Sequence, residues 1–206
     1  MYRAVLDTCA LVPGTQRDFL LQLATEEAYA PLWGSGILFE LDYVLAGLDA
    51  KRGRDGSEER RKHLFGQMQR AFPGAEINAP KGRVYDHGLD DPDDGHVAHA
   101  AILGKADAIV TDDKRAGFKT SSALAEAEVD IVYAHQFAAN TVFAHPEAGV
   151  RALLAMSDRM TAPPRSPADL LEELRLRYGM EEVAQILSPL LPPRLIKARA
   201  RRRSPS

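Results

Sequence analysis

The side chains best suited to chemistry in this sequence are acidic and lie far apart along the chain: Asp7, Glu40, Asp94 and the adjacent Asp112 and Asp113. Asp7 and the Asp112–Asp113 pair each follow a short apolar run that is typical of a buried strand. Because ligands of open parallel sheets bind at the carboxyl ends of the strands, we expect these acids at one edge of a sheet. An aspartate at a strand end is also a common turn former, so each signal alone indicates little.

Helix geometry predicts where Asp94 points. At about 100° per residue, an apolar stripe runs along the helix expected over residues 91–103, and Asp94 lies in line with the centre of that stripe, one turn before it begins. Its carboxylate is therefore predicted to point inward from a helix N-terminus, where backbone N–H groups favour an anion. Asp93 lies well to the side and is the better candidate for a simple cap. The stripe consists of Val97, Ala98, Ala101 and Ile102.

Glu40 is a weaker candidate, because it lies at the edge of a second apolar stripe, about 40° from Val44 on the helical wheel. A carboxylate in that position is often only the boundary of an amphipathic helix. It joins the acidic set only if that edge of the helix faces Asp7.

An acidic cluster of this kind would need a cation. Like charges brought close together repel and raise one another's pKa values, so the cluster is costly when it is empty. All-oxygen ligands favour Mg²⁺ or Mn²⁺ over zinc. Divalent ions there would orient an attacking water, lower its pKa and stabilise a phosphodiester during in-line displacement.

Two other residue types could do chemistry and are interpreted differently. The helical wheel turns His96 and His99 toward the side opposite the apolar stripe, so we expect both to face solvent, away from the carboxylates. Cys9 is the only cysteine, which excludes an internal disulfide and a cysteine-based metal cluster and favours a reducing compartment. It lies within an apolar run and is expected to be a small buried hydrophobe rather than a nucleophile.

The elements that must position these residues alternate between strand and helix up to residue 134. This order predicts an α/β, three-layer fold with a central, mainly parallel sheet flanked by helices. Beyond it only helices are expected, which gives an α/β domain over 1–143, a small helical extension over 144–193 and a basic, disordered tail over 194–206. The expected strands are residues 4–6, 83–85, 108–111 and 131–133, and the expected helices include 19–24, 37–48, 65–72, 91–103, 121–128, 146–154, 166–178 and 181–187.

Charge is distributed unevenly over the 206 residues. The net charge is −3, but without the six basic residues after Pro193 the rest of the chain carries −9. An acidic body does not suit a protein that grips phosphates by a broad basic surface, so any nucleic-acid chemistry would need metal ions to cancel carboxylate charge. The basic residues of the tail are Arg194, Lys197, Arg199, Arg201, Arg202 and Arg203.

The sequence offers no membrane or export signal. No uninterrupted apolar run is long enough to cross a bilayer. The short apolar segment at the start is interrupted by Asp7 and lacks the features of a signal peptide. We therefore expect a cytoplasmic protein with no membrane partner.

Four segments together resemble the PIN-domain family, and specifically the VapC-like toxin branch with a helical C-terminal extension. The resemblance covers about residues 1–137, and the segment around 146–187 also resembles that extension. Each segment alone is a weak signal, but four in this order and at this spacing are fairly specific. The segments are residues 5–14 (VLDTCALVPG), 37–41 (ILFEL), 91–101 (DPDDGHVAHAA) and 108–113 (AIVTDD).

The resemblance implies a metal-dependent ribonuclease whose acids hold Mg²⁺ or Mn²⁺. Asp7 matches the first acid of the family, Glu40 the second, Asp94 the third and Asp113 the fourth. Asp112 leaves the fourth assignment open, because either adjacent carboxylate could reach the ion. The resemblance also implies that Thr8 and Thr111 are supporting hydroxyls near the metal or the scissile phosphate.

The main hypothesis is an RNA-cleaving toxin of a type II toxin–antitoxin pair. Its partners would be an RNA substrate and a cognate antitoxin that pushes a basic side chain into the acidic groove, and the resemblance implies a homodimer. The alternative is a catalytically silent PIN scaffold that binds RNA or protein through the helical extension and the tail.

Overall fold

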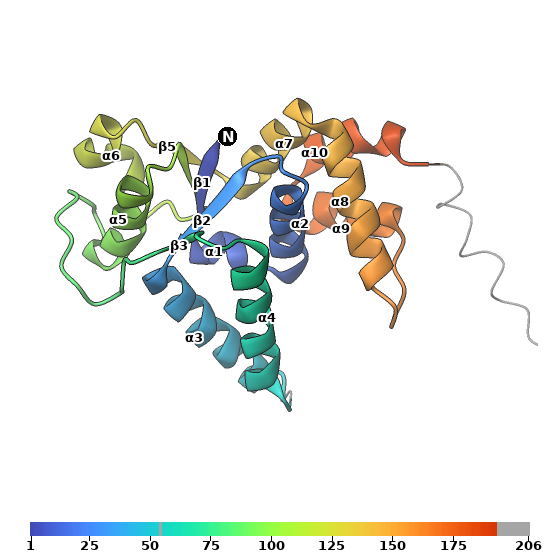
Figure 1. Cartoon of the computed structure of the whole chain (residues 1–206), viewed down its shortest axis with the longest axis horizontal. Coiled ribbons are helices and arrows are strands. Elements are labelled where there is room, and N and C mark those ends of the chain that lie inside the picture. The colour runs from blue at the N-terminus through green and yellow to red at the C-terminus, as the bar shows by residue number, and fades with distance from the viewer. Residues whose placement is uncertain (54, 193–206) are drawn as a thin grey trace, which may run out of the picture. The chain divides into compact units, whose positions relative to one another are not determined.

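The computed structural model describes residues 1–53 and 55–192 (Figure 1). The chain forms two compact units. The first contains Met1–Pro13 and Tyr29–Ala134, and the second contains Gly14–Ala28 and the described residues from His135 onward. The boundary expected after residue 143 remains a prediction, and the basic tail over 194–206 lies outside the described residues.

A parallel sheet forms the centre of the first unit, as predicted. Among the described residues it has five strands: β1 (Arg3–Leu6), β2 (Ala30–Gly34), β3 (Glu76–Ile77), β4 (Ala108–Val110) and β5 (Asp130–Val132). Their order is β3-β2-β1-β4-β5, and every neighbouring pair is parallel. The carboxyl ends of all the strands therefore lie at the same edge.

The central strand β1 fixes the register of the site. Its Val5 lies opposite Leu32 of β2 on one side and Ile109 of β4 on the other. Leu6 is paired with Val110. The residues that follow these two, Asp7 and Thr111, are therefore neighbours at the edge of the sheet. The apolar side chains of β1 and β4 are fully buried, which is typical of a parallel sheet covered on both faces.

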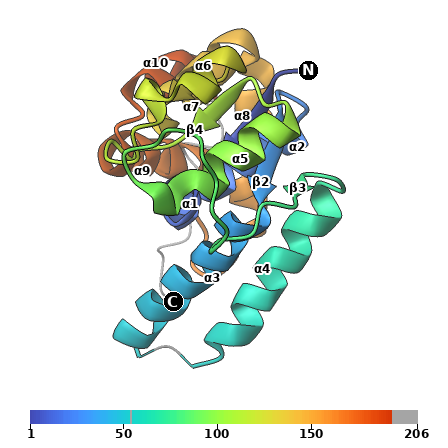
Figure 2. The ribbon, with the colours of Figure 1, turned by 90° about the vertical axis from the view of Figure 1, so that its left-hand side faces the viewer.

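Helices cover the sheet and carry the remaining site residues. The helix α5 packs against β1, β2 and β4. The helices α3 and α4 lie side by side as a hairpin (Figure 2), and Arg61 Nε of α4 lies 2.7 Å from Asp42 Oδ1 of α3. The helices of this unit are α1 (Thr8–Leu11), α3 (Ser35–Lys51), α4 (Ser57–Ala71), the 3₁₀ turn η1 (Pro92–Asp94), α5 (Gly95–Gly104), η2 (Phe118–Thr120) and α6 (Ser122–Glu126).

The strands β2 and β3 were not predicted. Pro31 and Gly34 suggested breaks, yet both belong to β2. Because β3 pairs only with Trp33 and Gly34, Pro31 lies where β2 has β1 as its only partner, and a residue without an N–H is tolerated there. Burial by α5 then overrides the local preference.

The strand expected over residues 83–85 is wrong. Val84 is almost fully exposed, and the segment is a loop. Tyr85 instead stacks on His99, with ring centroids 4.4 Å apart. A side-chain stack therefore holds this segment where a ladder of backbone hydrogen bonds was expected.

The second unit is helical, as expected for the chain beyond the sheet. A capping box formed by Ser166 and Asp169 begins α9, and Gly179, whose φ of 66° suits a glycine, caps its C-terminal end. Leu153, Leu174 and Val183 are fully buried within the unit. Its helices are α2 (Gly14–Thr25), α7 (Ala134–Ala144, starting at the last residue of the first unit), α8 (Pro146–Arg159), α9 (Pro167–Tyr178), α10 (Glu181–Leu187) and η3 (Ser188–Leu190).

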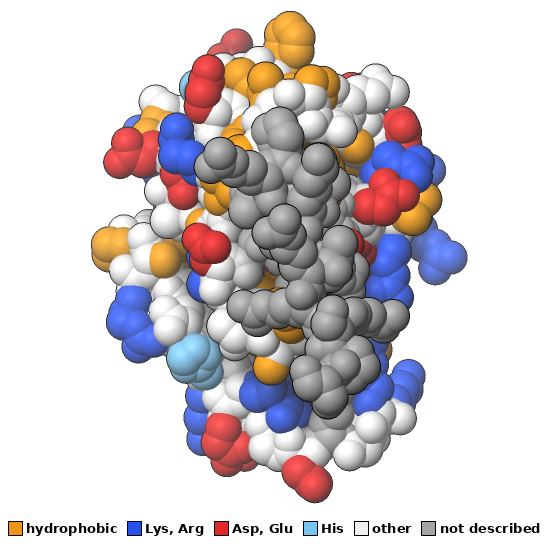
Figure 3. All heavy atoms as spheres, turned by 90° about the vertical axis from the view of Figure 1, so that its right-hand side faces the viewer, with side chains coloured by type: hydrophobic (Ala, Val, Ile, Leu, Met, Phe, Trp, Pro, Cys, Tyr) orange, Lys and Arg blue, Asp and Glu red, His pale blue; other side chains and the backbone are white. Residues whose placement is uncertain are grey.

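Two surface properties of the described residues bear on partners. None of their helices is both long and apolar enough to span a membrane. On the coloured parts of the face drawn in Figure 3, basic and acidic side chains are interspersed.

Candidate functional site

Four of the predicted acids line one cavity of about 800 Å³ in the first unit: Asp7, Glu40, Asp94 and Asp113. Each comes from a different element, namely the end of β1, the helix α3, the turn η1 that leads into α5, and the loop after β4. Residues up to 106 positions apart in the sequence are thus brought to one cavity.

Asp7 is a buried carboxylate held by three donors. It is only 6% exposed and caps α1. Its Oδ1 accepts the Thr8 backbone N–H at 2.6 Å, and its Oδ2 accepts the Thr111 hydroxyl at 2.7 Å and the Cys9 thiol at 3.1 Å. Burial raises the pKa of Asp7, these donors oppose that shift, and the charge of Glu40 adds to it.

The two threonines predicted as supporting hydroxyls contact the carboxylates directly. Thr8 Oγ1 donates to Glu40 Oε2 at 2.9 Å and so connects α1 to α3. Thr111 is fully buried, donates to Asp7, and its Oγ1 accepts the Asp113 backbone N–H at 3.0 Å. Their role near a metal or a scissile phosphate remains a prediction, but they clearly order the acids.

Glu40 lies between a lysine and a histidine. Lys81 Nζ forms an ion pair with its Oε1, and His96 Nε2 lies 3.4 Å from its Oε2. Burial alone would raise the pKa of Glu40, but His96, Lys81 and Thr8 together lower it to about 2. Glu40 therefore remains ionised at any physiological pH.

Lys81 was not identified from the sequence. It lies in the loop between β3 and η1, 41 residues from its partner Glu40, and no local pattern marks it. The loop is held on the start of α3, where the Gly36 N–H donates to Ala79 O at 2.9 Å. A Cβ at Gly36 would lie 2.7 Å from Lys81 N and 2.5 Å from the His96 ring, so a glycine is required here.

The prediction that His96 faces solvent is wrong. His96 is 1% exposed and lies beside Glu40. The wheel failed because α5 is buried on nearly every side, so its less apolar face is also covered. His96 Nδ1 donates to Asp93 O at 2.9 Å, so only the protonated ring can present a second N–H toward Glu40.

His99 is partly exposed and does not contact the carboxylate cavity. It stacks on Tyr85, and its Nδ1 lies 3.4 Å from His87 Nε2. The expectation that His99 lies away from the acids agrees with this position.

Among the described residues, Asp94 lacks the donors that hold Asp7 and Glu40 in place. Although it is the residue before α5, its side chain makes no capping hydrogen bond. Burial and the charges of Asp7, Asp91 and Asp113 raise its pKa to about 6. The neighbouring carboxylates therefore lie close enough to disfavour ionisation of Asp94, which is mostly ionised at neutral pH and takes up its proton as the pH falls through about 6.

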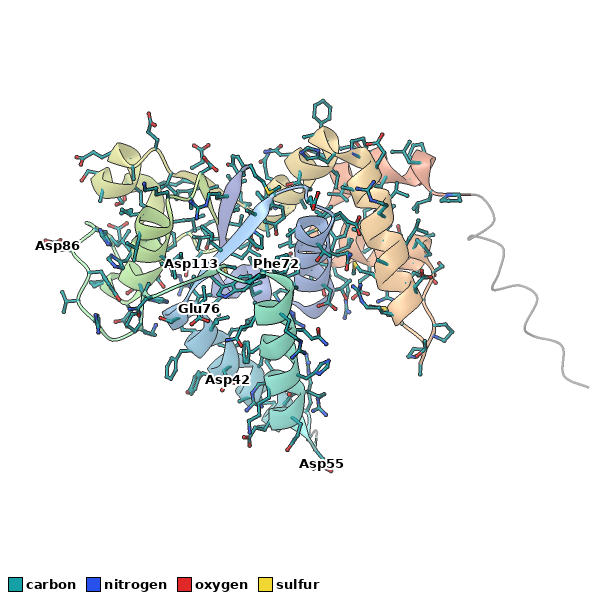
Figure 4. The ribbon with its side chains drawn as sticks, in the orientation of Figure 1. Asp42, Asp55, Phe72, Glu76, Asp86 and Asp113 are labelled. Atoms are coloured by element: carbon teal, nitrogen blue, oxygen red, sulfur yellow. The ribbon has the colours of Figure 1, made fainter. Side chains whose placement is uncertain are left out.

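The structure distinguishes the two adjacent aspartates. Asp113 lines the cavity, and Figure 4 shows it near the strand ends, whereas Asp86 lies far out on a loop. Asp112 does not line the cavity, and its Oδ1 accepts the Ala134 backbone N–H at 3.2 Å. The geometry therefore favours Asp113 as the fourth acid.

Cys9 is more than the buried hydrophobe we expected. It is partly exposed, lines the cavity, donates to Asp7 and accepts the Asp112 backbone N–H at 3.1 Å. Burial and the charge of Asp7 raise the pKa of Cys9 to about 12. The thiol stays protonated, which agrees with the interpretation that it is not a nucleophile.

The carboxylates of the cavity are the right type of ligand for a hard divalent cation, but they are not arranged around one point as metal ligands would be. Carboxylate oxygens are the ligands that Mg²⁺ and Mn²⁺ prefer. Yet no group of three or more His, Cys, Asp or Glu residues among the described residues is arranged to hold a metal. The oxygens of Asp7 and Glu40 already accept protein donors, so a metal ion bound there would share these carboxylates with those donors or displace some of them.

Comparison with known proteins agrees with this geometry. A family model described as PIN domain matches residues 3–115, a segment that contains all four acids and Lys81. No curated protein and no solved structure matches the chain. The helices from α7 onward lie outside the matched segment.

Proposed function

The chain belongs to the PIN-domain family, a nuclease superfamily, and from this premise we propose that it is a metal-dependent endoribonuclease that hydrolyses RNA phosphodiester bonds. The observation that carries the proposal is the shared cavity of Asp7, Glu40, Asp94 and Asp113. Burial and the charges of the neighbouring carboxylates raise the pKa of Asp94 to about 6, and a bound cation would offset the charge part of that shift.

The acids divide the work in this proposal. Asp7, Asp94 and Asp113 would hold Mg²⁺ or Mn²⁺, which supplies positive charge for the phosphodiester and lowers the pKa of the attacking water. Glu40, whose pKa is about 2, is suited to accept a hydrogen bond from that water and to orient it. The water oxygen forms the new P–O bond, the P–O3′ bond breaks, and the products carry a 5′-phosphate and a 3′-hydroxyl.

The biological role in this proposal is that of the toxin in a type II, VapBC-like toxin–antitoxin pair. The helices beyond the matched segment support it, because the chain resembles the VapC-like branch that carries a helical extension. The cognate antitoxin would insert a basic side chain among the acids, where Asp94 lacks a side-chain capping hydrogen bond. A homodimer in the cytoplasm remains part of this proposal.

Cleavage of a labelled RNA in Mg²⁺ tests the nuclease activity. The wild-type protein and the Asp112→Asn control, which keeps the Ala134 contact outside the cavity, are expected to cleave it. Asp94→Asn and chelation by EDTA are each expected to reduce the rate about 100-fold or more, because metal charge stabilisation is worth several kcal/mol. Undiminished cleavage by Asp94→Asn would overturn the assignment.

A catalytically silent PIN scaffold is the second candidate, and two observations favour it. No ready-made group of three metal ligands occurs among the described residues, and Lys81 pairs with Glu40 in the manner of a permanent counter-ion. A silent scaffold would leave RNA intact in either metal and show no carboxylate-dependent uptake of Mn²⁺.

A further inference from the structure

Two aromatic side chains project from the rim of the acidic cavity. Phe39 is 66% exposed and Tyr43 is 76% exposed, and both line the cavity together with the four acids. Single exposed apolar residues are normal on a protein surface. Two large rings in one cavity, one helical turn apart, are a less ordinary feature.

The geometry of α3 explains why both rings lie beside the acids. Residues four apart on a helix share one face, so Phe39 and Tyr43 are neighbours, and Glu40 follows Phe39 by about 100°. Glu40 is held inward by Thr8 and Lys81. Asp42 instead faces α4 and pairs with Arg61. The hairpin therefore leaves the aromatic face of α3 uncovered at the cavity.

Charge limits how such a cavity could bind a polyanion. Without the six basic residues after Pro193 the chain carries −9, so the described body gains little from phosphate contacts and counterion release. Among the described residues that line the cavity, Lys81 is the only lysine or arginine. Most of the affinity for a nucleic acid must then come from contacts to its bases, and aromatic stacking is the strongest contact of that kind.

We propose that Phe39 and Tyr43 form a stacking platform that holds unpaired bases next to the phosphate to be cleaved. The proposal rests on the nuclease function and adds the residues that position its substrate. Bases in a duplex are already stacked on their neighbours, so the platform selects nucleotides that are splayed out of a helix.

The composition of the cavity favours bases over a second copy of the chain. A single-stranded nucleic acid presents phosphates and flat rings in alternation, and the cavity offers Lys81 and the acids, for phosphate and metal, beside the two aromatic rings. A second copy of the chain would bring its own negative charge to the same four carboxylates. We therefore commit to nucleic acid and make self-association an outcome of the test.

Fluorescence anisotropy of a labelled single-stranded RNA, measured in EDTA, separates binding from cleavage. We expect Phe39→Ala and Tyr43→Ala each to raise Kd about 5-fold or more, because stacking on one ring is worth about 1–3 kcal/mol. Phe39→Tyr and Tyr43→Phe keep a ring and should bind as the wild type does. Phe143→Ala removes an equally exposed ring that does not line the cavity and should also leave Kd unchanged.

A second measurement identifies the contact as stacking. Loss of one base from the RNA should weaken binding to the wild-type protein but should have little effect on the alanine variant that lacks the ring on which that base stacks. No detectable binding by the wild type, equal Kd values for the alanine variants and the wild type, or a change confined to self-association in sedimentation would overturn the platform. If binding depends on the rings but the wild type cleaves no RNA in Mg²⁺, the platform stands and the nuclease function fails.

Discussion

The two sides of the acidic cavity are built differently. On one side Asp7 accepts three protein donors, and Glu40 is paired with Lys81 and lies beside His96. On the other side Asp94 makes no capping hydrogen bond, and its pKa rises to about 6. The protein thus supplies its own countercharge on the first side and leaves negative charge unbalanced on the second. A cation is expected to enter where that charge is unbalanced.

Removal of the most fixed acid should have the largest effect on activity. Asp7→Asn should lower the rate of RNA cleavage about 1,000-fold, since one ligand to a catalytic metal supplies several kcal/mol of charge stabilisation. The fold should survive, because asparagine is also a good N-cap for α1. Cleavage assays and thermal unfolding check both halves of the prediction. Near-normal cleavage by Asp7→Asn would show that Asp7 has only a structural role.

A methyl group added at Gly36 should disturb the side of the cavity on which Glu40 pairs with Lys81. Gly36→Ala places a Cβ 2.5 Å from His96 and 2.7 Å from Lys81 N, so the loop that carries Lys81 must move. We expect a loss of about 1–3 kcal/mol in the free energy of unfolding, as for other overpacked sites. Denaturant unfolding measures it. Gly47→Ala is the matched control, because a Cβ there meets nothing within 4 Å; equal effects of the two variants would contradict the prediction.

The two sides should respond with opposite sign when one charge is removed. The pKa of Glu40 is lowered from 4.5 to about 2, so its carboxylate stabilises the fold above pH 4.5 and loses that effect as the pH falls through 2. The pKa of Asp94 is raised from 3.8 to about 6, so its carboxylate destabilises the fold above pH 6 and that cost disappears as the pH falls toward 3.8.

At pH 7 without metal, Glu40→Gln should therefore lower the free energy of unfolding and Asp94→Asn should raise it. Each change should be about 1 kcal/mol once solvent screening of these half-buried groups is considered. Denaturant unfolding at pH 7 and pH 4.5 checks the sign, and the gain from Asp94→Asn should shrink at the lower pH. A loss of stability in both variants would remove the distinction between the two sides.

Removal of the internal cation should have the smallest effect. Lys81→Gln keeps a polar side chain in the loop but frees Glu40 Oε1 from its ion pair. We expect Mn²⁺ to bind a few times more tightly, because the cavity then lacks the positive charge of Lys81, which repels a cation bound by the neighbouring carboxylates. Calorimetry gives the affinity, with Lys119→Gln as a control that lies outside the cavity. Weaker Mn²⁺ binding would mean that Lys81 assists the metal.

The sequence predicted those features that depend on local pattern. The apolar runs before Asp7 and Asp112 identified two strands of the parallel sheet, and the stripe on α5 predicted that Asp94 points inward. These predictions hold because burial of a strand or of a helix face is recorded in neighbouring residues.

Features that depend on tertiary contact were missed. Lys81 reaches Glu40 only because its loop packs on Gly36, and no nearby residue records that contact. His96 was placed in solvent because the wheel treats the less apolar face of a helix as open, whereas α5 is covered there too. Pairing with β1 and β3 made a strand of residues 30–34 despite Pro31.

The central claim is that the carboxylates of this cavity hold a divalent cation. Calorimetric titration of the wild-type protein with Mn²⁺ tests it without reference to any RNA, with Asp94→Asn and the outlying Asp112→Asn titrated in parallel. The account predicts saturable binding by the wild type and by Asp112→Asn, and a loss of most of that binding in Asp94→Asn. No saturable binding by the wild type, or binding that Asp94→Asn leaves unchanged, would contradict it.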